Sequence, residues 1–188
     1  FKSNYVLIDT QIPAMTKNII LKIDRLIQTS LTQLASDKHV QLWRAKERDW
    51  VNYYAHRYLI DKCNIKGPLK HAAQIGIEVG VPQPKNYQRL TVCRDIVIWP
   101  DIGKTCWDMN WKPRQHPLAI LEWKVHRPGH RNMKVNKERE WLRAYCKWQP
   151  MVVAYAVEVH GDKTGCPLTC TRFLGKDEKQ LWIDLRCS

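Results

Sequence analysis

Apolar residues recur at helical spacing in two segments near the N-terminus. Residues 16–35 place isoleucine and leucine on one side of a helix, which predicts an amphipathic helix there. A second helix is predicted from about Leu42 to about Ile60, where Glu47 falls on the same narrow arc as Trp50. A carboxylate on an apolar face is a candidate functional group. The alternative interpretation is a glutamate at the rim of that face that reaches water.

Further along the chain the hydrophobic period changes to two, which predicts strands. The predicted elements are strands at 75–81, 89–99 and 118–125, a helix at 134–148, a strand at 151–159, and weaker strands at about 168–174 and 181–186. This order predicts an α/β fold with a mixed sheet. Its core order is α-β-β-β-α-β, with an extra N-terminal helix and C-terminal strands. We expect two parts, an N-terminal helical arm over 1–40 and the main domain over 41–188.

The composition is that of a globular protein with a basic surface. Hydrophobic residues make up 44% and charged residues 26% of the chain, which excludes a disordered chain. The apolar runs are too short for a transmembrane helix. A net charge of +13 attracts polyanions, so nucleic acid is the leading partner, and a basic surface without a ligand is the alternative. No signal peptide is visible, so we expect a cytoplasmic protein, or one located wherever its DNA is.

Charged residues interrupt two of the predicted apolar strands. Asp95 lies inside the strand at 89–99 and, by simple alternation, on the face of Val97. Glu122 and Lys124 lie two residues apart in the strand at 118–125, so both point to one face. A carboxylate and an ammonium among apolar neighbours are costly unless they are paired or used. A solvent-facing pair on an edge strand is the alternative interpretation.

These segments together resemble the PD-(D/E)xK nuclease superfamily, which has the restriction-endonuclease-like fold. The matching stretches are RDIVI at 94–98 and ILEWKV at 120–125, in the order that the superfamily has. KERDWVNYYAHRYLI resembles the first core helix of members such as the archaeal Holliday-junction resolvases, with Glu47 at the position of their helix glutamate. The resemblance implies a Mg²⁺-dependent DNA endonuclease that hydrolyses phosphodiester bonds and leaves 5′-phosphate ends. Restriction, recombination, repair and mobile-element processing are all compatible with it.

The resemblance also implies a role for each matching residue. Asp95, Glu122 and the backbone carbonyl of Trp123 are expected to hold Mg²⁺, with Mn²⁺ as a substitute. Glu47 is expected to bind a second metal or a metal-bound water. Lys124 is expected to orient that water and to contact the phosphoryl oxygen.

The sequence departs from the superfamily pattern immediately before the metal-binding aspartate. Arg94, rather than a proline, precedes Asp95, and a literal Pro-Asp pair occurs later, at Pro100 and Asp101. We prefer Asp95 because it lies inside an apolar strand, where its position is well defined. Asp101 begins a loop and is the alternative.

Basic residues near these strands are candidates for binding nucleic acid. The connection at 100–117 is rich in tryptophan as well as in basic residues, which suits base stacking and phosphate contact, although an ordinary tryptophan-anchored loop is equally compatible. The residues from which we expect phosphate contacts are Arg94, Lys104, Arg127, His130, Arg131 and Lys134. DNA is the expected partner, with RNA as an alternative, no membrane, and a homodimer or larger nucleoprotein complex as the expected assembly. The alternative function is a non-catalytic nucleic-acid-binding module or subunit on the same fold.

Seven cysteines occur at irregular spacings. Cys166 and Cys170, with Cys187 and a histidine such as His160, could hold zinc. The spacing contains no second close pair, so structural or incidental cysteines are the preferred interpretation.

Overall fold

The computed structural model describes residues 14–40, 43–84, 87–126, 134–160 and 168–185. The helices are α1 (Ala14–Ser36), α2 (Glu47–Tyr54) and α3 (Lys134–Trp148). The strands are β1 (Ile75–Pro82), β2 (Thr91–Ile98), β3 (Ala119–His126), β4 (Val153–His160), β5 (Leu168–Leu174) and β6 (Asp177–Asp184). None of the helices in these ranges is both long and apolar enough to cross a membrane.

The six strands form one sheet in sequence order, from β1 to β6. Neighbouring strands are antiparallel except for β3 and β4, which are parallel and are connected through α3. A parallel pair needs a crossover connection, and a helix commonly provides it. The predicted α/β class with a mixed sheet is therefore confirmed, and β3 lies between β2 and β4 rather than at an edge of the sheet.

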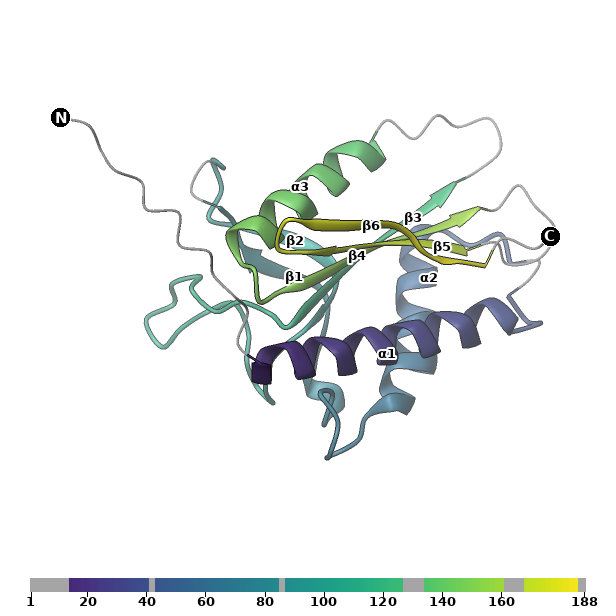
Figure 1. The fold of residues 1–188 in the computed structure, drawn as a ribbon, viewed down its shortest axis with the longest axis horizontal. Coiled ribbons are helices and arrows are strands. Elements are labelled where there is room, and N and C mark those ends of the chain that lie inside the picture. The colour runs from purple at the N-terminus through teal and green to yellow at the C-terminus, as the bar shows by residue number, and fades with distance from the viewer. Residues whose placement is uncertain (1–13, 41–42, 85–86, 127–133, 161–167, 186–188) are drawn as a thin grey trace.

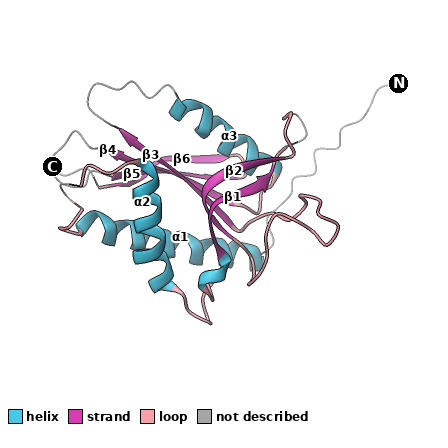
Figure 2. Cartoon of the chain, turned by 180° about the vertical axis from the view of Figure 1, so that it is seen from behind, coloured by secondary structure: helices cyan, strands magenta, loops and turns pink. Residues whose placement is uncertain are grey.

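The helices form a layer on each face of the sheet. Figures 1 and 2 show α3 on one side of the sheet and α1 and α2 on the other. The larger core contains the apolar face of α1, including Ile27 and Leu31, together with Leu121 of β3. The smaller core lies under α3 and contains Leu142 and Ile120. The helix α1 thus joins the main core, while the division into a 1–40 arm and a 41–188 domain stays a prediction.

The helix α2 begins later than the predicted start near residue 42. Lys46 has an extended backbone, with φ −76° and ψ 163°, and its N–H donates to the carboxylate of Asp49 at 3.0 Å. This capping contact ends the extended segment, so Glu47 becomes the first helical residue.

Simple alternation along β2 fails beside Asp95. The β1–β2 register runs from Ile75↔Ile98 to Ile77↔Ile96 and resumes at Val79↔Arg94, and the intervening Glu78 has a φ of +51°. A non-glycine residue in this left-handed region marks a local irregularity of the strand. As a result the Arg94 guanidinium packs on Trp141 of α3, on the same side of the sheet as Val97. Simple alternation, which puts Arg94 and Val97 on opposite faces, therefore does not hold at this point of β2.

Candidate active site

Asp95 lies where β2 separates from β3. The paired positions of these strands extend only from Ile98↔Ala119 to Ile96↔Leu121. Beyond them, the Asp95 side chain takes the place of a ladder acceptor, and its Oδ2 accepts the Trp123 N–H at 2.7 Å. Because the N–H and C=O of a strand residue point to the same side, the Trp123 carbonyl also points toward β2. The Asp95 carboxylate and the Trp123 carbonyl, which are expected to share a metal ion, are therefore both directed into the space between β2 and β3.

The ammonium of Lys124 connects three elements of the fold. Its Nζ lies 2.9 Å from Oε1 of Glu47 in α2 and 3.0 Å from Oε1 of Glu138 in α3. These helices cover opposite faces of the sheet. Side chains from both can reach Lys124 because the pairing of β2 with β3 ends at Ile96 and Leu121, before Lys124. Burial alone would lower the pKa of Lys124, but the hydrogen bonds to Glu47 and Glu138 raise it above the usual value. Lys124 is therefore held as a cation between two carboxylates.

Glu122 is buried next to these groups on the α3 side. Its Oε1 accepts from Arg94 at 3.0 Å, and only 6% of Arg94 and 7% of Glu122 are exposed. Within the described structure, Oε2 of Glu122 is buried without a hydrogen-bond partner. Burial raises the pKa of Glu122 to about 8, although Arg94 lowers it in part. Burial likewise raises the pKa of Asp95 to about 6.

The structure thus brings together five of the predicted residues around the separation of β2 and β3: Glu47, Asp95, Glu122, Trp123 and Lys124. Asp101 lies beyond the other end of the β2–β3 ladder, where Ile98 pairs with Ala119. It is exposed, and its Oδ1 accepts from the N–H of its own neighbour Ile102 at 2.9 Å. The geometry therefore favours Asp95 over Asp101 as a partner of Glu122.

The residues expected to contact phosphate are less well placed. Arg94 is buried between Glu122 and Trp141, which does not fit a direct phosphate contact. Lys104 is exposed, on a connection that leads into the start of β3, whereas Lys124 lies toward its end. Of the remaining four, Arg127, His130 and Arg131 lie outside the described residues, and Lys134 begins α3 without a described side chain.

The connection between β2 and β3 is an ordered loop with exposed aromatic side chains. Trp107 pairs with Pro113 in an isolated bridge, and the Asp108 carboxylate accepts from two backbone N–H groups of the same turn. Trp107 is 39% and Trp111 80% exposed. The proposed base stacking by this loop stays a prediction. Its place at the start of β3 separates it from Lys124 and Glu122.

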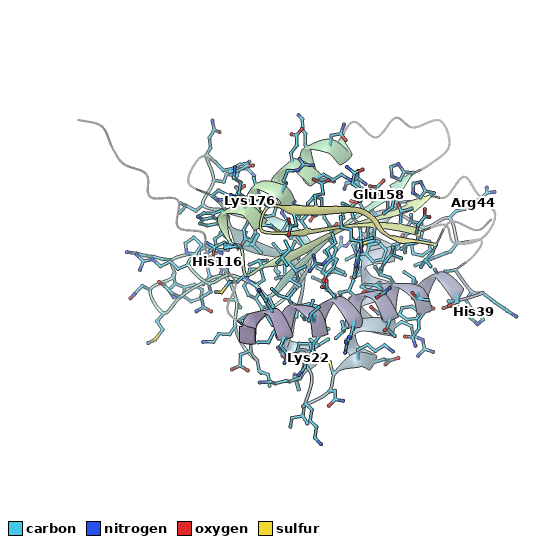
Figure 3. All side chains as sticks on the ribbon, in the orientation of Figure 1. Lys22, His39, Arg44, His116, Glu158 and Lys176 are labelled. Carbon is cyan, nitrogen blue, oxygen red and sulfur yellow. The ribbon has the colours of Figure 1, made fainter. Side chains whose placement is uncertain are left out.

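Sequence reasoning missed three charged residues of this region. Glu138 and Arg139 come from α3, and Glu158 comes from β4. A pocket on the α3 side is lined by Glu122, Lys124, Glu138, Arg139, Ala156, Val157 and Glu158. Glu138 precedes the buried Leu142 by one helical turn, so the helical period could have placed it on the inner face. Glu158 interrupts the apolar run of β4, as Asp95 interrupts that of β2, and Figure 3 shows it on the α3 side of the sheet.

A different set of residues has the closest metal-like spacing in the described part of the chain. His126, Glu158 and His160 each offer a ligand atom within 4.8 Å of the others, a spacing that Glu47, Asp95 and Glu122 do not meet. Cys170 does not join this set. It is buried in the core on the α1 side, whereas the neighbouring Thr169 contacts His160. The described structure therefore does not support Cys170 and His160 as ligands of one zinc ion.

The pocket is locally acidic in a strongly basic protein. Of the five charged residues that line it, three are the carboxylates Glu122, Glu138 and Glu158, although the chain as a whole carries a net charge of +13. Comparisons with protein-family models, curated proteins and solved structures gave no match. A function can therefore be argued only from the chemistry of this site.

Removing the Arg94 side chain is expected to destabilise the protein. The Arg94→Ala variant leaves the buried Glu122 carboxylate without its ion-pair partner, which costs about 3–5 kcal/mol of unfolding free energy for a buried pair. Urea unfolding in metal-free buffer at a pH above 8, where Glu122 is ionised because its pKa is about 8, measures this cost. Arg143→Ala is the matched control, because it breaks the pair with Glu178, in which 47% of the arginine side chain is exposed. We expect the control to lose about 0–1 kcal/mol, and equal losses would contradict the role of burial.

Proposed function

We propose that this protein is a metal-dependent DNA endonuclease with a site of the PD-(D/E)xK type, hydrolysing phosphodiester bonds and leaving 5′-phosphate ends. The observation that carries the proposal is the buried, unpartnered Oε2 of Glu122 beside Asp95 and Lys124. A buried oxygen without a partner is costly, and a cation would satisfy it. Three antiparallel strands, a crossover helix and a parallel fourth strand also support the restriction-endonuclease-like topology.

The donor set fits a hard divalent cation. Asp95, Glu122 and the Trp123 carbonyl would hold Mg²⁺ through oxygen atoms, which are the ligands that Mg²⁺ and Mn²⁺ prefer. Burial raises the pKa values of Asp95 and Glu122, so the fold disfavours their negative charge, and a bound cation would offset that cost. When bound, the metal supplies positive charge against the phosphate and acidifies a bound water.

The residues of the chain supply orientation and a fixed positive charge. Lys124 is held between Glu47 and Glu138, so its ammonium is directed at one point of the pocket before a substrate binds. A preorganised cation stabilises the negative charge that develops on the phosphoryl oxygens. Glu47, at the N-terminus of α2, would bind a second metal or orient a water. Arg94 acts on Glu122 and is a positioning residue.

The excess of basic residues supplies the affinity for DNA. A chain with a net charge of +13 displaces counterions from phosphate, so binding should weaken steeply as salt increases. The acidic pocket within this basic chain limits close approach of phosphate unless a cation is present. Binding of DNA and binding of metal are therefore expected to support each other.

Cleavage of defined nucleic acids tests the proposal. The purified protein is incubated with supercoiled plasmid, single-stranded DNA, branched DNA and RNA, each with Mg²⁺, Mn²⁺ or EDTA. We expect nicking or linearisation of DNA with Mg²⁺ or Mn²⁺ and none with EDTA, and product ends that ligase joins directly because they carry 5′-phosphate. Absence of cleavage of every DNA substrate at all metal concentrations would contradict the proposal.

The second candidate function is a non-catalytic nucleic-acid-binding module. The specific observation in its favour is that Lys124 and Arg94 already pair with carboxylates of the site, so part of the cluster is neutralised without a metal. This candidate predicts salt-dependent DNA binding that is equally strong in EDTA and in Mg²⁺. The nuclease predicts tighter DNA binding with Ca²⁺, a cation that binds oxygen ligands.

A further inference from the structure

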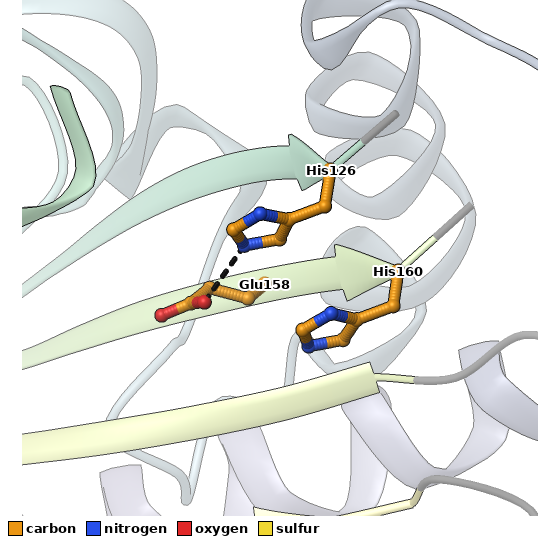
Figure 4. Close-up of side chains that lie close together, drawn as sticks. All are labelled: His126, Glu158 and His160. Atoms are coloured by element: carbon orange, nitrogen blue, oxygen red, sulfur yellow. Dashed lines mark hydrogen bonds and ion pairs between the residues drawn. The ribbon is translucent and has the colours of Figure 1, made fainter. Parts of the chain in front are cut away.

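The ends of the parallel strands β3 and β4 carry a histidine pair. His126 is the last residue of β3 and lies opposite His160, the last residue of β4. Their rings are stacked, with centroids 4.7 Å apart and planes inclined by 5°. Figure 4 shows both rings extending from the strand ends toward Glu158. Nε2 of His126 lies 2.8 Å from Oε2 of Glu158, and each of the three residues has a ligand atom within 4.8 Å of the others.

Two imidazoles and one carboxylate are a ligand set for transition metals. Imidazole nitrogen suits Zn²⁺, Cu²⁺, Fe²⁺ and Ni²⁺, whereas Mg²⁺ prefers oxygen ligands. Metal–ligand distances near 2.0–2.1 Å imply ligand atoms about 3.3 Å apart in a tetrahedral site. Rotation of the two rings about χ2, a torsion with broad preferences, can bring the nitrogens closer than they are here.

Neighbouring side chains already orient two of the three groups, Glu158 and His160. Arg139 bonds to Oε1 of Glu158, which leaves Oε2 directed at His126. Oγ1 of Thr169 in β5 lies 3.1 Å from Nε2 of His160. Hydrogen bonds of this kind to ligating residues hold them in place and raise metal affinity. The cluster therefore has the outer contacts of a site as well as its ligands.

We propose that His126, Glu158 and His160 bind a divalent transition-metal ion of the zinc class. Three protein ligands leave at least one coordination position open, as in sites that bind water or a further ligand. The ion would join the ends of β3 and β4, and it would stabilise the folded protein because the unfolded chain does not hold the ligands together. This site differs from the oxygen-ligand site of the proposed nuclease in both residues and metal, so each can exist without the other.

Titration of the metal-free protein with Co²⁺ tests the site, because Co²⁺ replaces Zn²⁺ and absorbs visible light in a way that depends on its ligands. We expect saturable binding with a spectrum of nitrogen and oxygen ligands, displacement by Zn²⁺ but not by Mg²⁺, and a higher thermal unfolding temperature with Zn²⁺. His126→Ala and His160→Ala are expected to weaken Co²⁺ binding more than about 100-fold, beyond the range for losing an outer contact. Glu158→Gln keeps the hydrogen-bonding capacity of the side chain, and it is also expected to weaken Co²⁺ binding.

Two variants serve as matched controls, and circular dichroism verifies that every variant folds. His56→Ala removes an exposed histidine of the π-helical turn that follows α2, and it should leave Co²⁺ binding unchanged. Glu122→Gln removes a ligand of the proposed nuclease site and should also keep it, whatever its effect on cleavage. No Co²⁺ binding by the wild type, wild-type binding by both histidine variants, or loss of binding in Glu122→Gln would each overturn the proposal. Thiolate–cobalt charge-transfer absorption would overturn it as well, because it would place the ion at cysteines.

Discussion

Replacing Lys124 with methionine is expected to lower the rate of DNA cleavage by about 10²–10³-fold, the cost of losing one preorganised electrostatic group in an active site. The ammonium is fixed by Glu47 and Glu138 at 2.9 and 3.0 Å, so it is positioned before the transition state forms. Its charge matters most as negative charge builds on the phosphoryl oxygens. Binding of Mn²⁺ and of DNA should therefore change far less than the cleavage rate.

Single-turnover cleavage beside calorimetric Mn²⁺ titration separates these effects. Lys176→Met is the matched control, because this lysine is exposed beside the β5–β6 turn, and it should cleave at the wild-type rate. The cleavage rates of the two variants then compare the same substitution inside the pocket and outside it. A folded Lys124→Met protein with full activity would defeat the assignment of Lys124.

The Asp95→Asn variant is expected to reduce cleavage to the background measured in EDTA, while Asp101→Asn should keep most of the activity. Asparagine retains an oxygen that can accept the Trp123 N–H, a bond of 2.7 Å in the structure, but it removes the charge that holds a cation. Asp101 is exposed and its carboxylate accepts from its own loop. The pair of variants thus compares an aspartate of β2 that is bonded to the Trp123 backbone with an exposed aspartate of the loop that follows.

Stability provides a second measurement for Asp95→Asn. Burial raises the pKa of Asp95 to about 6, above its unfolded value, so the fold disfavours the ionised carboxylate and stability from this group decreases as pH rises through that range. Neutral asparagine avoids this cost, and metal-free Asp95→Asn should unfold at a urea concentration at least as high as the wild type does at pH 8. A strongly destabilised variant would show that Asp95 is held for structural reasons. The reverse ranking of the two aspartates in cleavage would identify the literal Pro-Asp pair as the motif.

Periodicity was sufficient for most of the secondary structure because the burial of apolar side chains repeats at 3.6 residues in helices and at two in strands. The predicted helix at 134–148 and the predicted strand at 168–174 coincide with α3 and β5. The start of α2 was missed by several residues, since a capping contact of Lys46 with Asp49, rather than hydrophobicity, decides where that helix begins. Alternation along β2 failed at Arg94, because the irregularity at Glu78 shifts the strand's faces and periodicity does not record it.

The sequence by itself determined the α/β class and the placement of Glu122 and Lys124 on one face, because these follow from local period and order. Only the tertiary structure decided what surrounds them. The contacts of Lys124 with Glu47 and Glu138 join segments far apart in the chain. They depend on the point at which β2 separates from β3. The meeting of His126, Glu158 and His160 likewise depends on the parallel register of β3 and β4, which arises when α3 packs on the sheet and which no local pattern specifies.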